Sequence, residues 1–314
     1  MVAVLGVQDY SNTIAKRGTF TDIALYNLKR DIHTVTLVEP VRYPERLAPL
    51  FFAVSEVDKA IVVVDDLNST LGEILVILQC CGIRNGIFIL RNYLTEEKFR
   101  PLIDGTILAE YEFLSDDPNV LREKLLQEAE EQKSVEMPTG TVPVDHAFNV
   151  KGVGTVILGV VTNGTVKKHD LVDVLPTEQK SQIRSIQKHD DEFGSAGKGD
   201  RVGLSLKGIG VEDVERGTVL SNDPAIKVSK VVKGQASLIK YWPSPIKNGM
   251  VLHIGHWMQF LNCKVETVTD EGDWRKPDLT LALEKGLVHY PNENAVLMYL
   301  EGGKLRVIGT INLP

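Results

Sequence analysis

Short apolar runs alternate with longer segments of mixed polarity over the first 136 residues. The runs are rich in valine and isoleucine and lie at Val2–Leu5, Val35–Val38, Ala60–Val64 and Gly86–Leu90. Continuous apolar runs of this length are typical of strands that are buried on both faces of a parallel sheet. Between and after them, helices are predicted over Pro44–Val54, Leu71–Cys81, Thr95–Leu102 and Pro118–Glu136. The pattern therefore predicts a doubly wound α/β domain over residues 1–136, with a mostly parallel sheet.

The pattern changes after a short linker at Met137–Pro143, which contains two prolines and a glycine. Beyond the linker, helical periodicity almost disappears, and short strands follow one another between turn signals such as Thr162-Asn163-Gly164. A second break falls at Asn222-Asp223-Pro224, and the remaining residues are again rich in strand patterns. We therefore predict three domains, at residues 1–136, 137–223 and 224–314, of which the last two are β-barrels.

Composition and charge narrow the classes of protein that are compatible with the chain. No apolar stretch reaches the roughly 18 residues of a membrane span, and the first residues lack the features of a signal peptide, so we expect a cytoplasmic protein. The three cysteines, Cys80, Cys81 and Cys263, predict buried thiols and no disulfide framework or zinc site. The net charge of −7 is concentrated in residues 1–136, which carry 14 basic and 22 acidic residues, whereas residues 226–314 carry 11 and 8. A nucleic-acid partner would therefore have to bind a local basic patch.

The most specific sequence pattern lies in residues 141–220. It begins TVPVDHAFNVKGVGTVILGVVTNGTVKKHDLVDVLP and continues IRSIQKHDDEFGSAGKGDRVGLSLKGIGVEDVERGTVL. This pattern resembles the second domain of the EF-Tu class of translation elongation factors, and it is most similar to the selenocysteine-specific SelB branch. Gly152, Gly154 and Gly159 fit a small barrel, because glycine permits close strand approach and sharp bends. The resemblance implies an α/β plus all-β fold, in which a P-loop-GTPase-like domain is followed by two β-barrels.

Residues 232–268 extend the resemblance into the third domain of the same factors. Gly249, His253 and Gly255 match a pattern of that domain in which a glycine precedes His-x-Gly, and we interpret His253 as a packed structural histidine. Towards the end of the chain, Lys304 and Arg306 stand where the family has arginine-rich strands that help to hold the tRNA acceptor arm. The chain ends at Pro314, and we expect no counterpart of the C-terminal domain by which SelB reads its mRNA signal.

The resemblance implies a GTP-binding domain over residues 1–136, yet the phosphate loop is degraded there. A phosphate loop has the pattern G-x-x-x-x-G-K-[ST], because glycines let the backbone wrap the phosphates, the lysine meets the β and γ charges, and the hydroxyl holds Mg²⁺. The matching segment begins at Gly6 and ends at Thr13, with Ser11 and Asn12 in place of the second glycine and the lysine. Asp9 adds a negative charge. We therefore interpret Gly6, Ser11, Asn12 and Thr13 as a degenerate phosphate loop.

Other nucleotide motifs of the family are replaced as well. The magnesium-side D-x-P-G-H motif matches the segment from Glu39 to Tyr43, which places a tyrosine at the catalytic histidine. The guanine-reading N-K-x-D motif matches the segment from Arg91 to Leu94, which lacks the aspartate. Lys16-Arg17-Gly18 is interpreted as a remnant of the start of the first switch region. We therefore expect no GTPase activity, no catalytic residue, no metal site and no cofactor. The role of this domain stays open between a locked scaffold, a docking surface and a hydrophobic cover for the barrels.

Three residues of the second domain match the pocket that receives the aminoacyl group in SelB-like factors. Asp145 and His146 stand at the start of the first barrel strand, and Arg201 follows a glycine-rich turn. The resemblance implies that Arg201 and His146 favour an acidic group such as a selenolate, with Asp145 orienting one of them. The alternative is an ordinary surface ion pair of Arg201 with Asp200 or Asp145. We predict that Asp145, His146 and Arg201 converge on one concave site.

The function that these patterns favour is a SelB-like, elongation-factor-like protein that is a pseudo-GTPase. Its expected partner is aminoacyl-tRNA, with the ribosome as a second candidate, and neither a membrane nor DNA is expected. Two alternatives remain open. One is a functional GTP-binding elongation factor with a disguised nucleotide site, and the other is a protein-interaction scaffold. Nucleotide binding and tRNA binding separate these three.

Overall fold

A seven-stranded mixed sheet organises the N-terminal part of the chain, in the strand order β2-β3-β4-β1-β5-β6-β7. The computed structural model describes residues 1–314 except 32, 132–136 and 190. The strands of the seven-stranded sheet are β1 (Val2–Leu5), β2 (Lys16–Phe20), β3 (Ile23–Arg30), β4 (His33–Pro40), β5 (Lys59–Val64), β6 (Asn85–Leu90) and β7 (Glu112–Leu114). Strands β4, β1, β5, β6 and β7 are parallel, whereas β2 and β3 are antiparallel to their neighbours.

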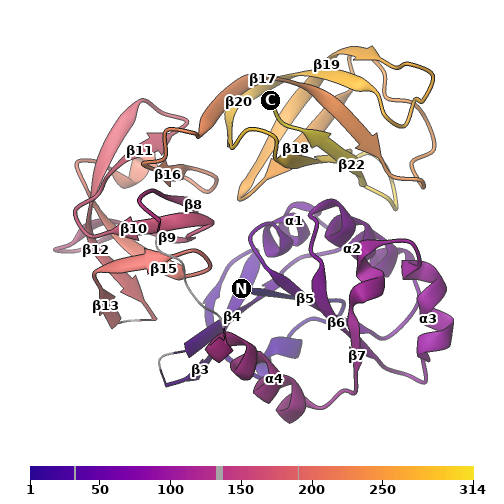
Figure 1. Cartoon of the computed structure of the whole chain (residues 1–314), viewed down its shortest axis with the longest axis horizontal. Coiled ribbons are helices and arrows are strands. Elements are labelled where there is room, and N and C mark those ends of the chain that lie inside the picture. Colours follow the sequence, from indigo (N-terminus) through magenta and orange to yellow (C-terminus); the bar gives the residue numbers. More distant parts are fainter. Residues whose placement is uncertain (32, 132–136, 190) are drawn as a thin grey trace. The chain divides into compact units, whose positions relative to one another are not determined.

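Helices cover both faces of this sheet (Figure 1). They are α1 (Ala48–Val54), α2 (Ser69–Cys80), α3 (Glu96–Ile103) and α4 (Pro118–Glu131). The leucines of α4 pack in one cluster with Ile87 and Ile89 of β6. Phe88, between them, packs on Phe99 of α3 with ring centroids 4.7 Å apart. Because successive side chains of a strand point to opposite faces, α3 and α4 lie on opposite faces, as in a doubly wound domain.

The four predicted strands are confirmed, and so are the four helices, with shifted ends. Helix α1 begins at Ala48, four residues later than predicted, and its proline at Pro49 lies in the first turn, where a missing N–H costs nothing. Asn68 caps α2 by accepting from the N–H of Leu71 at 3.0 Å. The predicted helix up to Glu136 is described only as far as Glu131, and the rest lies outside the described residues. The β2–β3 hairpin was not predicted.

The residues after the linker form two barrels. In the first, β8 (Gly140–Val150), β16 (Val219–Ser221), β11 (Leu171–Leu175), β12 (Gln179–Lys188), β15 (Arg201–Lys207) and β9 (Gly154–Val160) close into a ring of antiparallel pairs. Three further strands are β10 (Asn163–Lys167), β13 (Asp191–Phe193) and β14 (Ser195–Gly197). Gly159 is required where β9 crosses β8, because a Cβ there would lie 2.2 Å from the carbonyl oxygen of Pro143.

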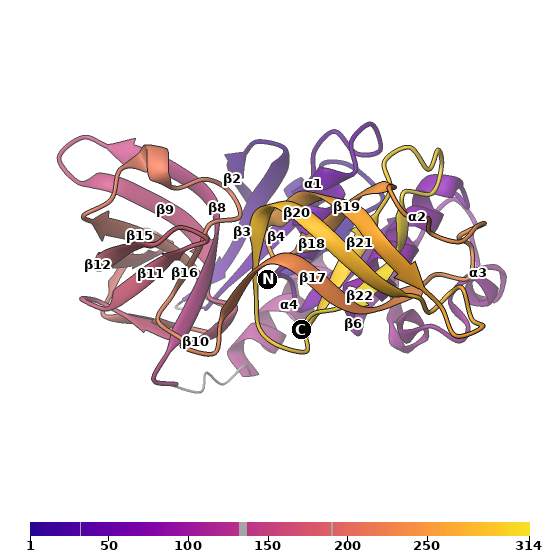
Figure 2. The same ribbon diagram turned by 90° about the horizontal axis from the view of Figure 1, so that it is seen from above.

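The second barrel is closed in the order β17-β20-β19-β18-β21-β22 (Figure 2). Its strands are β17 (Lys227–Leu238), β18 (Val251–His256), β19 (Gln259–Thr269), β20 (Asp278–His289), β21 (Asn294–Met298) and β22 (Val307–Asn312). Among the described residues of both barrels, the helical structure is one 3₁₀ turn, at Val211–Asp213. The predicted fold class is therefore confirmed, and the three domain boundaries stay predictions.

By their contacts, the residues group into two compact units. One comprises Met1–Gln132 with Met298–Gly309, and the other Lys133–Leu297 with Thr310–Pro314. No helix in the described part of the chain is both long enough and apolar enough to cross a membrane.

Candidate functional site

The loop that we predict to be a degenerate phosphate loop follows β1 and begins at a glycine whose backbone leaves no room for a side chain. Gly6 has φ +98°, and a Cβ at this position would lie 2.0 Å from the carbonyl oxygen of Val63 on β5. The loop then enters one 3₁₀ turn at Tyr10–Thr13, and strand β2 begins at Lys16. A phosphate loop normally opens a longer helix, whose N-terminal N–H groups and dipole favour an anion. This loop has only the single turn in that place.

Backbone N–H groups of the loop donate to an internal carboxylate. Glu39, near the end of β4, is 4 % exposed. Its Oε1 accepts from the N–H of Ser11 at 2.6 Å, and its Oε2 accepts from the N–H of Asp9 at 2.8 Å. Burial raises the pKa of Glu39, and these donors oppose that rise. Backbone N–H groups of such a loop are the donors that cradle phosphate in a nucleotide-binding protein. Here a side chain of the same chain accepts them.

The other residues of the degenerate loop form bonds within it. The Thr13 hydroxyl, which would hold Mg²⁺ in a phosphate loop, donates to the carbonyl of Tyr10 at 2.7 Å. The Asn12 amide, at the lysine position, donates to Asp9 Oδ1 at 3.2 Å. Among the described residues, no group of three or more His, Cys, Asp or Glu could hold a metal ion.

A charged network occupies the segment that matches the guanine-reading motif. Arg91 follows β6, and its Nε lies 3.1 Å from Asp116, while its NH1 lies 3.4 Å from Asp65. The Tyr10 hydroxyl donates to Asp116 Oδ1 at 2.7 Å. Burial, together with Asp116, raises the pKa of Tyr10, so the phenol stays protonated. The network therefore links the degenerate loop to the loops that follow β5, β6 and β7.

Tyr43, which the sequence match places at the catalytic histidine, is buried. Its hydroxyl donates to the carbonyl of Thr70 at 3.0 Å. Within the same unit, Glu73 of α2 is 2 % exposed and pairs with Arg306 through Nε at 3.1 Å and NH2 at 2.5 Å. The Arg306 N–H also donates to Glu73, at 2.9 Å. Sequence reasoning missed Glu73, although a lone carboxylate among the apolar residues of α2 is a signal for a buried partner.

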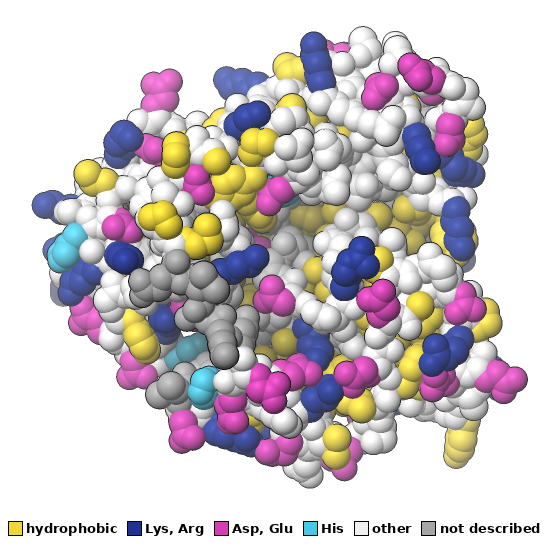
Figure 3. Space-filling model, viewed as in Figure 1, with side chains coloured by type: hydrophobic (Ala, Val, Ile, Leu, Met, Phe, Trp, Pro, Cys, Tyr) yellow, Lys and Arg dark blue, Asp and Glu magenta, His cyan; other side chains and the backbone are white. Residues whose placement is uncertain are grey.

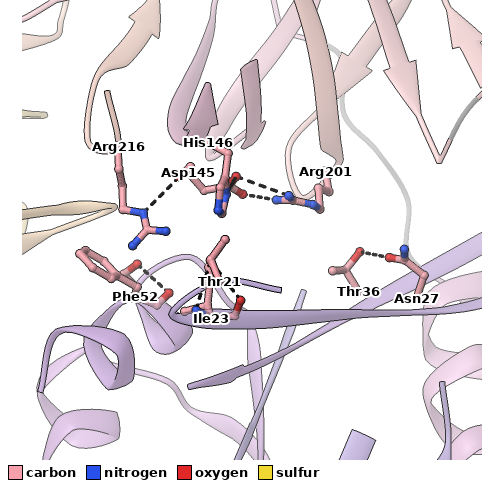
Figure 4. Close-up of polar contacts among 10 residues, drawn as sticks. Thr21, Ile23, Asn27, Thr36, Phe52, Asp145, His146, Arg201 and Arg216 are labelled. Carbon is pink, nitrogen blue, oxygen red and sulfur yellow. Dashed lines mark hydrogen bonds and ion pairs between the residues drawn. The ribbon is translucent and has the colours of Figure 1, made fainter. Parts of the chain in front are cut away.

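The structure brings Asp145, His146 and Arg201 together (Figure 4). Asp145 and His146 are neighbours on β8, and successive side chains normally point to opposite faces. A register shift falls between Val144 and His146, so two residues of β8 oppose one residue of β9. Such a bulge re-aims side chains, and His146 Nδ1 lies 2.7 Å from Asp145 Oδ1. Arg201 opens β15, the other neighbour of β9, and its guanidinium pairs with both oxygens of Asp145.

The carboxylate of Asp145 is the centre of this group. It is 3 % exposed, and burial alone would raise its pKa, but the charge of Arg201 and the hydrogen bonds from His146 and Arg201 outweigh burial and lower the pKa to about 2. Arg216 donates through Nε to the backbone carbonyl of Asp145 at 3.1 Å. Arg201 therefore pairs with Asp145, one of the two partners of the alternative interpretation, and the carboxylate of this pair is buried. Asp200 instead pairs with Lys188, at 2.6 Å.

Comparison of the chain with known proteins identifies its relatives. An uncharacterized protein of Methanocaldococcus jannaschii is 36% identical over 307 residues, which cover 96% of this chain and 95% of that protein. The family profile described as Elongation factor Tu domain 2 matches residues 154–221. The chain belongs to the EF-Tu class of translation factors. The selenocysteine-specific elongation factor of the same organism is 25% identical over 277 residues.

Within the EF-Tu class, the SelB factors also share the fold. The crystal structure of SelB from Methanococcus maripaludis with the GTP analogue GPPNHP superposes with a TM-score of 0.83 at 19% identity, over 99% of this chain and 78% of that one. The chain spans 58% of the length of the selenocysteine-specific factor from Methanocaldococcus jannaschii. The chain therefore has the fold of SelB over the residues that align with it.

Proposed function

We propose that the chain is an elongation-factor-like protein that binds aminoacyl-tRNA without control by a guanine nucleotide. The observation that supports this most is the Glu39 carboxylate, which accepts the N–H groups of Asp9 and Ser11 in the loop that matches a phosphate loop. A nucleotide phosphate would have to displace this carboxylate from its donors.

Displacement is unfavourable for electrostatic reasons. Two unit negative charges 4 Å apart repel by about 4 kcal/mol at an effective dielectric constant near 20. Asn12 in the lysine position supplies no positive charge to offset that repulsion, and Asp9 adds a further carboxylate. Arg91 is engaged with two aspartates at the place of the guanine-reading motif. In this proposal the protein is not a GTPase, and its first domain is a scaffold that is fixed without nucleotide.

The barrels supply the tRNA contacts in this proposal. A guanidinium has five N–H donors. Asp145 engages NH1 and NH2 of Arg201, so donors remain for a second acceptor. An anionic group of the aminoacyl residue, such as a selenolate, would share Arg201 with Asp145, and a protonated His146 would add a second positive charge. In this proposal, Asp145 orients Arg201 and His146. The cytoplasm, which contains the tRNA, is the proposed location.

Charge on the surface limits how the tRNA backbone is held. In the view of Figure 3, Lys and Arg side chains alternate with Asp and Glu side chains and form no broad basic area. If the tRNA backbone meets this face, recognition of the aminoacyl end would contribute a larger share of the affinity than in a strongly basic RNA-binding protein. The ribosome remains a second proposed partner. A scaffold that binds only protein is the rival function, and it predicts no tRNA binding.

Calorimetry with GTP and GDP, with and without Mg²⁺, tests the first half of the proposal. We expect dissociation constants no tighter than millimolar, and a micromolar value would favour a disguised GTPase. Binding of charged and deacylated tRNA to Arg201→Ala tests the second half. Loss of a charge-assisted hydrogen bond should cost about 1–3 kcal/mol with charged tRNA and almost nothing with deacylated tRNA.

Two further variants, His146→Ala and Lys188→Ala, separate a loss of tRNA binding from a folding defect in Arg201→Ala. Arg201→Ala removes the partner of a buried carboxylate, so its thermal unfolding is measured in parallel. His146→Ala removes the second proposed contact and leaves the Arg201–Asp145 pair intact. Lys188→Ala, in the same barrel and paired with Asp200, is the matched control. Equal losses with charged and deacylated tRNA would reduce Arg201 to a general phosphate contact.

A further inference from the structure

Strand β2 is the outer strand of the sheet in the first unit. It pairs with β3 on one side and stands at the end of the strand order, so its other side carries no neighbouring strand among the described residues. Four of its five residues are exposed, and the fifth is half-buried. An edge strand of this kind presents a row of backbone N–H and C=O groups that a further strand can pair with.

A bulge in β2 determines which face of the sheet each side chain at this edge is on. Arg17 pairs with Tyr26 and Phe20 pairs with Ala24, so two residues of β2 lie opposite one residue of β3 between these pairs. Tyr26 and Ala24 are two residues apart and share a face, and the bulge therefore places Arg17 and Phe20 on that same face. The Arg17 guanidinium accordingly lies 5.2 Å from the centroid of the Phe20 ring. Lys16, the neighbour of Arg17, is on the opposite face.

The edge therefore combines Lys16 on one face with Arg17 and an exposed aromatic ring on the other, and the Arg17 guanidinium also lies 3.9 Å from Asp9 Oδ1. Phe20 is 55 % exposed, and its ring lies against the Arg17 guanidinium. Lysine on an edge strand also discourages aggregation, and that role alone would explain Lys16. It would not explain a phenylalanine that is held on the edge under a guanidinium.

We propose that β2 is a docking edge for an extended segment of a partner protein that adds a strand to the sheet and carries two adjacent acidic residues. Cross-strand pairs of opposite charge are favourable. Because successive side chains of the added strand point to opposite faces, adjacent acidic residues would meet Lys16 on one face and Arg17 on the other. An apolar residue farther along would cover Phe20. Main-chain bonds supply the affinity and these side chains the specificity, as in other cases of strand addition.

The probe is a nine-residue peptide of alternating valine and threonine with a central Glu-Asp pair, titrated against the full chain by fluorescence anisotropy. We expect binding, and hydrogen exchange that slows at residues 16–20. The same peptide with a Lys-Lys pair should bind about tenfold more weakly. The double variant Lys16→Glu/Arg17→Glu should reverse this preference. Its matched control changes two exposed basic residues of the same unit, as Arg84→Glu/Lys98→Glu, and should keep the wild-type preference.

Two further measurements separate strand addition from a plain charge contact. Methylation of alternate peptide N–H groups blocks an added strand in one of the two registers, so one methylated peptide should lose binding and the other should keep it. Phe20→Ser should weaken binding without changing the charge preference. Absence of peptide binding would overturn the proposal. Equal binding of both methylated peptides, or heparin binding at the same residues with the same charge dependence, would also overturn it, in favour of a general anion contact.

Discussion

Replacement of Glu39 by alanine should turn the degenerate loop into an open anion site. The side chain now accepts the N–H groups of Asp9 and Ser11 from within the protein. Without it, the buried Ser11 N–H loses its acceptor, at a cost of about 1–3 kcal/mol. The Asp9 N–H contributes less, because Asp9 is exposed and water can reach it. Glu39→Ala should therefore unfold at a lower temperature than the wild-type protein.

Inorganic phosphate should restore part of that loss, because an anion can take the place of the carboxylate. At a concentration 100 times the dissociation constant, a ligand stabilises the folded state by about 2.7 kcal/mol. For a domain of this size, that corresponds to about 5 °C or more in the unfolding temperature. The assay is thermal unfolding of the variant and the wild type over a phosphate series at constant ionic strength.

Two controls make this prediction refutable. The wild type measures the general stabilisation that phosphate gives to any protein, and only the excess in Glu39→Ala counts. Glu39→Gln fills the same volume with a neutral amide and should show no excess. If Glu39→Ala and the wild type respond equally to phosphate, the loop is not an anion cradle and the comparison with a phosphate loop is wrong.

The remaining predictions concern stability, measured by chemical and thermal unfolding. Gly6→Ala should lower the free energy of unfolding by more than about 3 kcal/mol, because it adds a clash with a backbone oxygen to an unfavourable φ. Gly82→Ala, at φ +71° and in open space, should lower it by only about 1–2 kcal/mol. Equal losses in the two variants would refute the close approach at Gly6. The pKa of Asp145 is depressed to about 2 from 3.8, so its carboxylate should contribute about 2 kcal/mol to the free energy of unfolding above pH 4, and this contribution should be lost as the pH falls towards 2. Asp145→Asn should abolish that part of the pH dependence of stability, and an unchanged dependence of stability on pH would contradict the prediction. Arg306→Ala should cost about 3–5 kcal/mol by leaving the Glu73 carboxylate buried without a partner, and Glu73→Gln combined with Arg306→Ala should recover part of the loss.

Much of the fold follows from local pattern. The parallel strands are continuous apolar runs, and Val2–Leu5 is found with its predicted bounds. The hairpin of β2 and β3 escaped prediction because Lys16–Phe20 is exposed and charged, and its strand form depends on pairing with β3. Helix α1 begins after Pro44, since the segment before Ala48 forms a turn. Local pattern therefore gives the elements, and tertiary pairing decides the exceptions.

Some residues of the candidate sites could be predicted from the sequence and others could not. The convergence of Asp145, His146 and Arg201 was predicted from the family resemblance, and the bulge that allows it has no signature in the sequence. The role of Glu39 was not predicted, because its partners are backbone N–H groups about 30 residues away and any residue type supplies those. The pair of Glu73 and Arg306 joins residues that are 233 positions apart, and neither residue alone identifies the other.

The most direct test of the account is the affinity of the pure protein for aminoacyl-tRNA in the absence of nucleotide. Filter binding or fluorescence titration would compare charged with deacylated tRNA, each without nucleotide, with GTP and with GDP. We expect charged tRNA to bind more tightly than deacylated tRNA, and we expect neither nucleotide to change either affinity. A marked gain in affinity with GTP over GDP would contradict it and identify a working nucleotide switch, and equal, negligible binding of both tRNAs would favour the protein-binding scaffold.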